Sequence, residues 1–324
     1  VDRGNNRKAR LTAIQAMDDY YRRNSKDPQA SAYTIQAAYN AAKLRRAGGD
    51  NTYKLWCART IGGFDVFKST AGQDDEGRNK ALGSKQADMA AECEYRELDA
   101  QIAKSFDYDS GHHRYQGVMK DVIAEFTKDV EVDAKAWFDK LQNVVLKYES
   151  RPWAVAARGR QGSLYDSCRT GLYNARAPGL KLYTDKEEKT LKKADKLCEE
   201  TGNERACTLG DTFRANRRAF WRKTRDENLA AVDKVMVAGY GEAVIWARAW
   251  KVRVDAADNA VRRLAFFTDI LGNEKLRDYS QNIKDPSTKQ AINYQDGMFL
   301  RMRRGLTADV KTEVLPAPVP GAAK

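Results

Sequence analysis

Proline is scarce in this sequence, with 7 residues among 324, and three of them (Pro316, Pro318 and Pro320) lie close to the C-terminus. Because proline breaks helices, long stretches are left free to be helical. No run of 18 apolar residues occurs, which excludes a membrane-spanning helix of ordinary type. Only two histidines are present and no CxxC or Cys/His cluster occurs, so the common zinc-binding patterns are missing.

The familiar catalytic motifs are absent as well. No GxSxG, GxGxxG or P-loop pattern occurs, and neither histidine has a plausible catalytic nucleophile near it in the sequence. We therefore predict that the protein is not an enzyme, needs no cofactor and has no small-molecule substrate. A glycan-cleaving enzyme stays open as a third hypothesis, because a helical fold can assemble paired carboxylates from distant segments.

Apolar residues recur at helical spacing along most of the chain, whereas alternation with a period of two is rare. Stripes over 33–44 and 53–60, separated by a Gly-Gly-Asp turn at 48–50, predict a pair of antiparallel helices. Further helices are predicted over 86–106, 115–126, 137–148, 153–172, 185–200, 229–240 and 244–264. Gly239 and Gly241 predict a kink. Short turns between such helices indicate an all-α fold of stacked antiparallel helical hairpins.

Composition and turn signals suggest three parts of the chain. We predict N-terminal helical-hairpin repeats over 1–150, C-terminal helical repeats over 151–310, and a Pro/Ala-rich tail over 311–324 that acts as a linker or a disordered end. No strict repeat length emerges, so a generic helical bundle stays the alternative to a solenoid. Because the sequence starts at Val1 without an initiator Met, we expect that a leader was removed or the chain was trimmed.

The net charge is +12, from 57 Lys and Arg against 45 Asp and Glu, and acidic residues are interleaved almost everywhere. This distribution argues against nucleic acid as a partner, because such binders usually gather their cations on one surface. The strongest local concentration of positive charge lies on one helical face. Its residues are the predicted partner-binding site: Arg214, Arg217, Arg218, Trp221, Arg222 and Arg225.

Cations around an indole are suited to phosphates, an anionic glycan or an acidic helix. The alternative interpretation is an amphipathic helix in which Phe213, Phe220 and Trp221 are core and the arginines pair with neighbouring carboxylates. A second aromatic and basic set surrounds Trp246 and Trp250, of which Trp250 falls on the apolar stripe and is expected to be buried.

Cysteines and histidines provide two further groups of interest. A tight connection at Thr201-Gly202-Asn203 would bring Cys198 and Cys207 face to face, and a disulfide between them would fit an oxidising compartment. The segment 107–113 holds both histidines beside two aspartates. Adjacent histidines cannot easily face one ion from a regular helix, so we favour a solvated helix-capping loop over a metal site there.

Two segments resemble known helical proteins. The run from Ala37 to Leu44, followed by Gly48-Gly49-Asp50 and then Tyr53, Leu55 and Trp56, resembles a tetratricopeptide helix pair. The segments 153–165 and 177–180 resemble the C-terminal helical part of tetratricopeptide lipoproteins from bacterial gliding-motility machinery. These resemblances imply a tetratricopeptide-like α-solenoid in the periplasm or at the outer membrane, attached to a membrane only through an anchor upstream of Val1.

These observations give two leading hypotheses. The first is a non-catalytic helical-repeat scaffold of the bacterial cell envelope, which binds protein partners of an envelope complex and belongs to a motility or secretion assembly. The second is a basic helical module that binds a polyanion, either a cell-wall polymer or nucleic acid. Binding to a polyanion should depend steeply on salt concentration, whereas binding to a protein partner should not.

Overall fold

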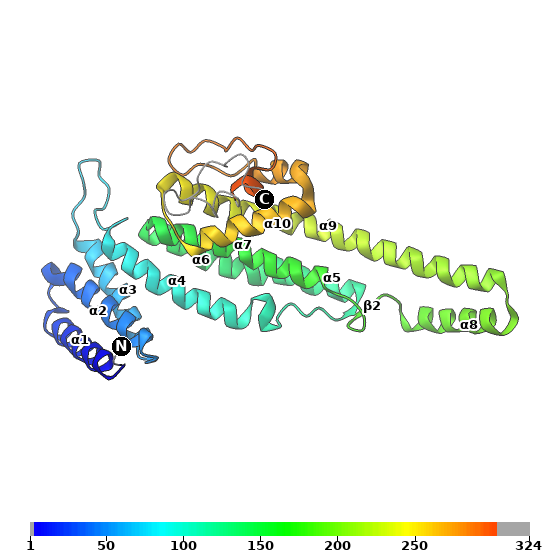
Figure 1. Ribbon diagram of the computed structural model, residues 1–324, viewed down its shortest axis with the longest axis horizontal. Coiled ribbons are helices and arrows are strands. Elements are labelled where there is room, and N and C mark those ends of the chain that lie inside the picture. The colour runs from blue at the N-terminus through cyan, green and yellow to red at the C-terminus, as the bar shows by residue number, and fades with distance from the viewer. Residues whose placement is uncertain (1–2, 303–324) are drawn as a thin grey trace.

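The structure is a computed structural model that describes residues 3–302, and the predicted tail over 311–324 lies outside the described residues. Most of the described chain is α-helical, which confirms the all-α class (Figure 1). The α-helices are α1 (Arg3–Asn24), α2 (Ser31–Ala47), α3 (Tyr53–Thr70), α4 (Lys85–Ser105), α5 (Met119–Lys128), α6 (Lys135–Tyr148), α7 (Arg151–Tyr173), α8 (Asp185–Thr201), α9 (Glu204–Trp250) and α10 (Asp255–Ser280).

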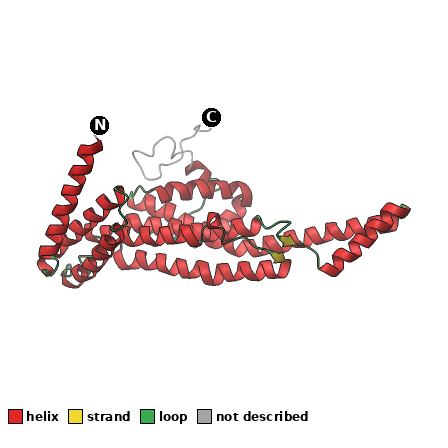
Figure 2. Cartoon of the chain, turned by 90° about the horizontal axis from the view of Figure 1, so that it is seen from below, coloured by secondary structure: helices red, strands yellow, loops and turns green. Residues whose placement is uncertain are grey.

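Other secondary structure is sparse within these residues. Two short strands, β1 (Gly117–Val118) and β2 (Leu180–Lys181), pair in parallel near the start of α8 (Figure 2). Turns of 3-10 helix lie at Pro28–Ala30 and Tyr108–Ser110, and a π-helical turn, Asp129–Ala134, joins α5 to α6. The expectation that strands are negligible is therefore confirmed for the described chain.

The N-terminal helices stack in chain order, with α1 against α2, α2 against α3 and α3 against α4. The predicted hairpin is present as α2 and α3, joined by a turn in which Gly49 has a φ of 74°. Glycine suits this turn because side chains disfavour that backbone conformation. A small cluster of alanines on α2 packs on Trp56, and the Arg45 guanidinium donates to the Asp18 carboxylate at 3.0 Å, which ties α2 to α1.

Helix α7 lies at the centre of the larger part of the molecule and packs against α4, α6, α9 and α10. Gly162 of α7 meets Gly239 of α9 so closely that a Cβ on Gly239 would lie 2.8 Å from the Gly162 backbone nitrogen. The predicted kink at Gly239 and Gly241 was wrong, because α9 runs unbroken through both residues. Glycine here lets two helix backbones approach closely. The sequence alone did not show whether these glycines bend the helix or allow such an approach.

The apolar stripe predicted to continue over 244–264 is interrupted. Helix α9 ends at Trp250, Lys251 takes a left-handed conformation with a φ of 51°, and α10 begins at Asp255. The reversal lays α10 back along α7 and α9. The stripe was a correct signal for burial, but it belongs to two helices instead of one.

The main hydrophobic cluster draws residues from Ile102 to Met302. It therefore includes side chains on both sides of the domain boundary predicted at 150/151, and α7 also packs directly on α4 and α6. The proposed boundary does not coincide with a break in packing.

No helix in the described part of the chain is both long and apolar enough to cross a membrane.

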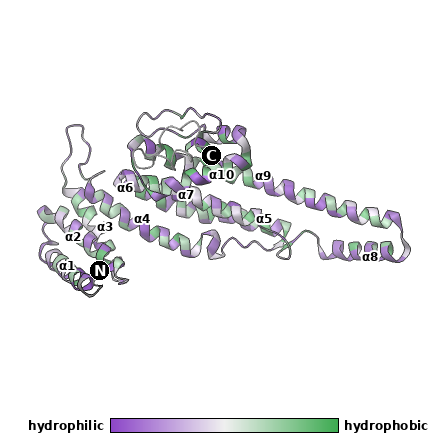
Figure 3. Ribbon diagram, viewed as in Figure 1, coloured by the Kyte–Doolittle hydropathy of each residue, from purple (hydrophilic) through white to green (hydrophobic). Residues whose placement is uncertain are grey.

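One part of the molecule extends well beyond this core (Figure 1). Helix α9 has 47 residues, which corresponds to about 70 Å. Its first part, residues 204–220, projects away from the other helices together with the antiparallel α8, and no other described helix packs extensively on α8. We call α8 and residues 204–220 the arm, and we call α4 to α7, residues 221–250 and α10 the body. Figure 3 shows hydrophobic and hydrophilic turns alternating along the arm.

Candidate functional site

The arm is built from strong local signals. Thr184 caps α8 in a capping box, in which its hydroxyl accepts from the Glu187 amide while the Glu187 carboxylate accepts from the Thr184 amide. Gly202 then ends α8 with a φ of 62°, and the Asn203 side chain caps α9. These signals set two helices antiparallel with a connection of two residues. The end of α8 therefore lies beside the start of α9.

Cys198 and Cys207 are joined by a disulfide with a Cα–Cα distance of 5.1 Å. The pairing expected from the tight connection is therefore confirmed. The remaining cysteines, Cys57, Cys93 and Cys168, are free, and Cys168 is buried in the core. The disulfide holds together the end of the arm, where few apolar side chains are buried.

The predicted arginine face is divided by the structure. Arg214 donates to both carboxylate oxygens of Asp195 on α8 at 2.5 Å, and Arg217 pairs with Glu187. The hydrogen bond and charge of Asp195 raise the pKa of Arg214. These two arginines pair with carboxylates of α8, as the alternative interpretation of the sequence expected.

Two more members of the set lie where the arm joins the body. Trp221 is 6% exposed and belongs to the main core. The Arg225 guanidinium lies 4.7 Å from the centre of the Tyr173 ring and donates to Asp226 at 2.8 Å. Both residues thus have contacts that anchor the base of the arm.

Arg218 and Arg222 remain as outward-facing cations. Both are exposed, and neither has a carboxylate within ion-pairing distance among the described residues. Within the described chain, the hydrogen bonding of the two guanidiniums is limited to Arg222 Nε, which donates to the Arg218 carbonyl at 3.4 Å. Partner binding by the predicted set stays a prediction, and the structure leaves these two guanidiniums with donors for a ligand.

The arm also has an apolar cavity. It has a volume of about 250 Å³ and lies between α8 and α9, where it is lined by Lys186, Glu187, Thr190, Leu191, Ala194, Leu209, Gly210 and Phe213. Leu209 at its edge is 66% exposed and Phe220 farther along α9 is 54% exposed. Large apolar side chains at such exposure are typical of surfaces that contact another molecule when they gather in one region.

The second aromatic and basic set lines a different space. Trp246 and Trp250 have ring centres 5.2 Å apart, both are half-buried, and the Arg158 guanidinium lies 4.8 Å from the Trp246 ring. They border a cleft of about 1280 Å³ together with residues of the 74–83 loop and the start of α7. Trp250 is thus less buried than its place on the apolar stripe predicted, because the chain turns directly after it.

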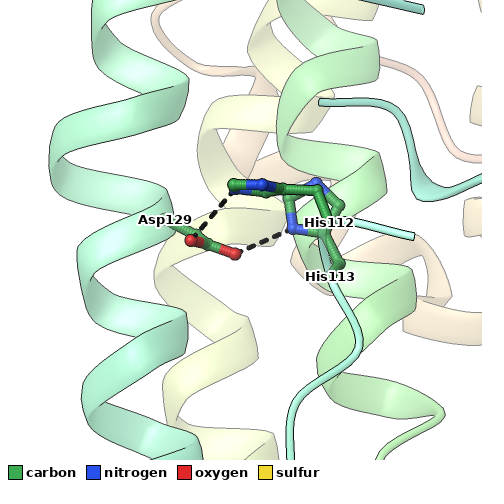
Figure 4. Close-up of side chains that lie close together, drawn as sticks. All are labelled: His112, His113 and Asp129. Carbon is green, nitrogen blue, oxygen red and sulfur yellow. Dashed lines mark hydrogen bonds and ion pairs between the residues drawn. The ribbon is translucent and has the colours of Figure 1, made fainter. Parts of the chain in front are cut away.

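Both histidines come together with a carboxylate on the body (Figure 4). His112 Nε2 lies 3.3 Å from one oxygen of Asp129, and His113 Nδ1 lies 2.9 Å from the other. Asp133, also on the π-helical turn, lies 3.9 Å from His112 Nε2. The prediction of a solvated capping loop was wrong for His113, which is 2% exposed.

Hydrogen bonds fix the Asp129 carboxylate in place. Tyr115 donates its hydroxyl to Asp129 Oδ2 at 2.9 Å. Burial raises the pKa of Asp129, but the hydrogen bonds from His113 and Tyr115 outweigh burial and leave that pKa below its usual value. Burial also raises the pKa of the Tyr115 hydroxyl, so Tyr115 acts as a donor at neutral pH.

Sequence reasoning found the histidines and the arginines but missed their partners. Asp129 follows His113 by 16 residues, and Asp195 precedes Arg214 by 19. Neither separation matches a helical repeat within one element, so only the packing of different elements reveals these pairs.

The fold and these sites define an all-α protein with a projecting helical arm. Comparisons with protein-family models, with curated proteins and with solved structures found no match.

Proposed function

We propose that this protein is a non-catalytic helical scaffold or adaptor of the bacterial cell envelope, and that it binds a protein partner through the arm. The observation that carries the proposal is the surface of the arm itself. An apolar cavity and the exposed Leu209 lie on the arm, which also carries Arg218, a cation without a carboxylate partner, and a second such cation, Arg222, follows where the arm joins the body. Such a surface is suited to a partner segment with apolar and acidic side chains.

The long α9 helix supports a role for the arm in binding a partner. Its residues 221–250 pack in the body, so the rigid helix transmits a fixed position to residues 204–220. A binding surface on such a hairpin needs little ordering when a partner docks, which favours affinity. The stacked α1 to α4 supply a second, tetratricopeptide-like element, in which each helix contacts the next. The tetratricopeptide-like solenoid architecture is part of this proposal.

The envelope location rests on two arguments. The Cys198–Cys207 disulfide fits an oxidising compartment such as the periplasm, because cytosolic thiols are generally kept reduced. The resemblance of 153–165 and 177–180 to gliding-motility lipoproteins points to the same compartment and to a motility or secretion complex.

Photocrosslinking in the producing cells tests the proposal. Benzoylphenylalanine would replace Leu209 on the arm and, as a matched control, Ile270 on α10, which is 49% exposed on the body. We expect a discrete protein adduct from position 209 that is absent from position 270. The double variant R218E/R222E should remove the adduct without lowering the thermal midpoint, because exposed charges contribute little to folding.

The variant R7E/K8E, which makes the same charge change on exposed positions of α1, should leave the adduct intact. An adduct that persists in R218E/R222E, or equal adducts from both positions, would refute the arm as the binding surface. Binding of purified protein to a polyanion with a steep salt dependence, lost in R218E/R222E but not in R7E/K8E, would instead favour the second hypothesis.

A further inference from the structure

The turn that carries both histidines places their rings on one side of a buried carboxylate. Gly111, with a φ of 84°, ends the 3-10 turn before them, so His112 and His113 do not lie on a helix. Their imidazoles reach the two oxygens of Asp129 at 3.3 and 2.9 Å, and the nitrogen and oxygen donors all lie within 4.8 Å of one another (Figure 4). The geometric objection to adjacent histidines as ligands therefore does not apply.

We propose that His112, His113 and Asp129 bind a divalent transition-metal ion, with Asp133 as the fourth protein ligand. Zinc bonds to histidine and carboxylate at about 2.0–2.2 Å, so ligands around a tetrahedral ion lie about 3.3 Å apart. The His112–Asp129 separation of 3.3 Å matches this value, the His113–Asp129 separation of 2.9 Å is somewhat shorter, and the 3.9 Å between Asp133 and His112 Nε2 closes with a small side-chain rotation. Two imidazole donors favour zinc and its neighbours over calcium or magnesium, which prefer oxygen ligands.

The backbone of the carboxylate side suits this role. Asp129 and Asp133 belong to a six-residue π-helical turn between α5 and α6. A π-turn is rare and is found frequently at functional sites. Residues four apart on this turn project toward the same side. The carboxylates of Asp129 and Asp133 therefore both approach His112 Nε2, at 3.3 and 3.9 Å.

The surroundings have the features of a supported metal site. Tyr115 donates to Asp129 and so orients the ligand carboxylate, as groups behind metal ligands commonly do. Phe106 packs on both imidazoles, with ring centres 5.2 Å from His112 and 4.7 Å from His113. The side chains of His112 and Asp133 are about one-third exposed, which gives an ion a path from solvent.

A purely structural role for His113 is incomplete. Its Nε2 is buried and has no hydrogen-bond partner among the described residues, and such a group in a native protein needs an explanation. A serine, asparagine or tyrosine would hydrogen bond to Asp129 without leaving that nitrogen unpaired. Ligation at Nδ1 leaves Nε2 unpaired, but it explains why a nitrogen ligand stands at this position instead of a hydroxyl or an amide. The bound ion would fasten the 107–116 loop to the junction of α5 and α6.

Titration of the EDTA-treated full chain with Zn²⁺ by isothermal calorimetry tests the site. We expect one ion per chain, with an affinity at least about tenfold weaker in His112→Ala, because a lost ligand costs no less than a lost supporting contact. Since the chain has only two histidines, no other imidazole can substitute. Because His112 also contacts Phe106 and Asp129, the metal-free thermal midpoint of His112→Ala is the reference for any shift that Zn²⁺ causes in this variant.

Asp129→Asn gives a nearly isosteric second test, and Arg114→Ala, exposed in the same loop, is the matched control that should bind Zn²⁺ as the wild type does. Zn²⁺ should raise the thermal midpoint of the wild type and Arg114→Ala but not that of His112→Ala. The Co²⁺ spectrum should show no thiolate charge-transfer band. Wild-type affinity in His112→Ala, no uptake by the wild type, or a thiolate band abolished by Cys57→Ser would overturn the proposal.

Discussion

The arm and the body differ in how far their ion pairs are exposed to solvent. In the body, Arg169 of α7 donates to Asp233 of α9 at 2.6 Å, and the two side chains are only 9% and 6% exposed. In the arm, Arg214 pairs with Asp195 while both side chains remain substantially in contact with solvent, at 27% and 41% exposed. The buried pair links α7 to α9, and removing either partner would leave the other charge uncompensated in the core, whereas the arm pairs are screened and contribute little.

The two regions also differ in how their helices are held. The α7–α9 crossing brings Gly162 and Gly239 into backbone contact inside a large apolar core. The arm has two helices and few fully buried apolar side chains, and its distal end is joined by a disulfide. The body therefore depends on close packing, while the arm keeps a defined shape through caps and a covalent link and leaves its surface free.

Breaking one ion pair in each region should separate these roles most strongly. Asp233→Ala leaves the Arg169 guanidinium buried without its partner, and we expect it to lower the free energy of unfolding by about 3–5 kcal/mol. Asp195→Ala in the arm should lower it by less than about 1 kcal/mol. Urea denaturation followed by circular dichroism measures both. Similar losses in the two variants would show that the arm pair contributes as much to folding stability as the body pair.

Glycine substitutions should produce effects of opposite sign. In Gly239→Ala the new Cβ would lie 2.8 Å from the Gly162 backbone, and the overpacking should cost about 1–3 kcal/mol. In Gly210→Ala the Cβ would lie 3.4 Å from the flexible end of Arg214, so the gain in helix propensity, up to about 1 kcal/mol, should dominate. Thermal unfolding of the whole chain, with hydrogen exchange to localise the change, distinguishes them. Destabilisation by Gly210→Ala would mean that the arm is as tightly packed as the body.

Acid should affect the two regions in opposite directions, with the smallest effects of this series. Hydrogen bonds from the amide and the hydroxyl of Thr184 lower the pKa of Glu187 below its ordinary value of 4.5. The capping box therefore stabilises the arm above that value, and this contribution is lost as the pH falls through the folded pKa.

Burial raises the pKa of Asp233 above 3.8, although Arg169 opposes the shift. The folded state then binds this proton more tightly than the unfolded state, so the Asp233 contribution to stability increases as the pH falls through its raised pKa. Amide NMR signals of Glu187 and Asp233, followed during an acid titration, should give a midpoint below 4.5 at the N-terminus of α8 and a midpoint above 3.8 around Asp233. A midpoint above 4.5 for Glu187 or below 3.8 for Asp233 would contradict these assignments.

Local signals were sufficient for much of the fold. Helical spacing and the scarcity of proline predicted the all-α class, Gly48-Gly49-Asp50 predicted the α2/α3 hairpin, and the Thr201-Gly202-Asn203 connection predicted the disulfide. These features depend on residues within a few positions of one another, and their physical preferences act before any tertiary contact forms.

Residue patterns alone indicate where helices form and which positions are apolar or charged, whereas the packing of distant elements settles what those positions do. Gly239, predicted to form a kink, lies instead where α9 crosses α7. Arg214 and Arg217 pair with carboxylates of α8, and Asp129 lies beside the two histidines. Each of these contacts depends on the packing of different elements. Helical periodicity specifies the face on which a side chain lies, but it does not specify the element that packs against that face.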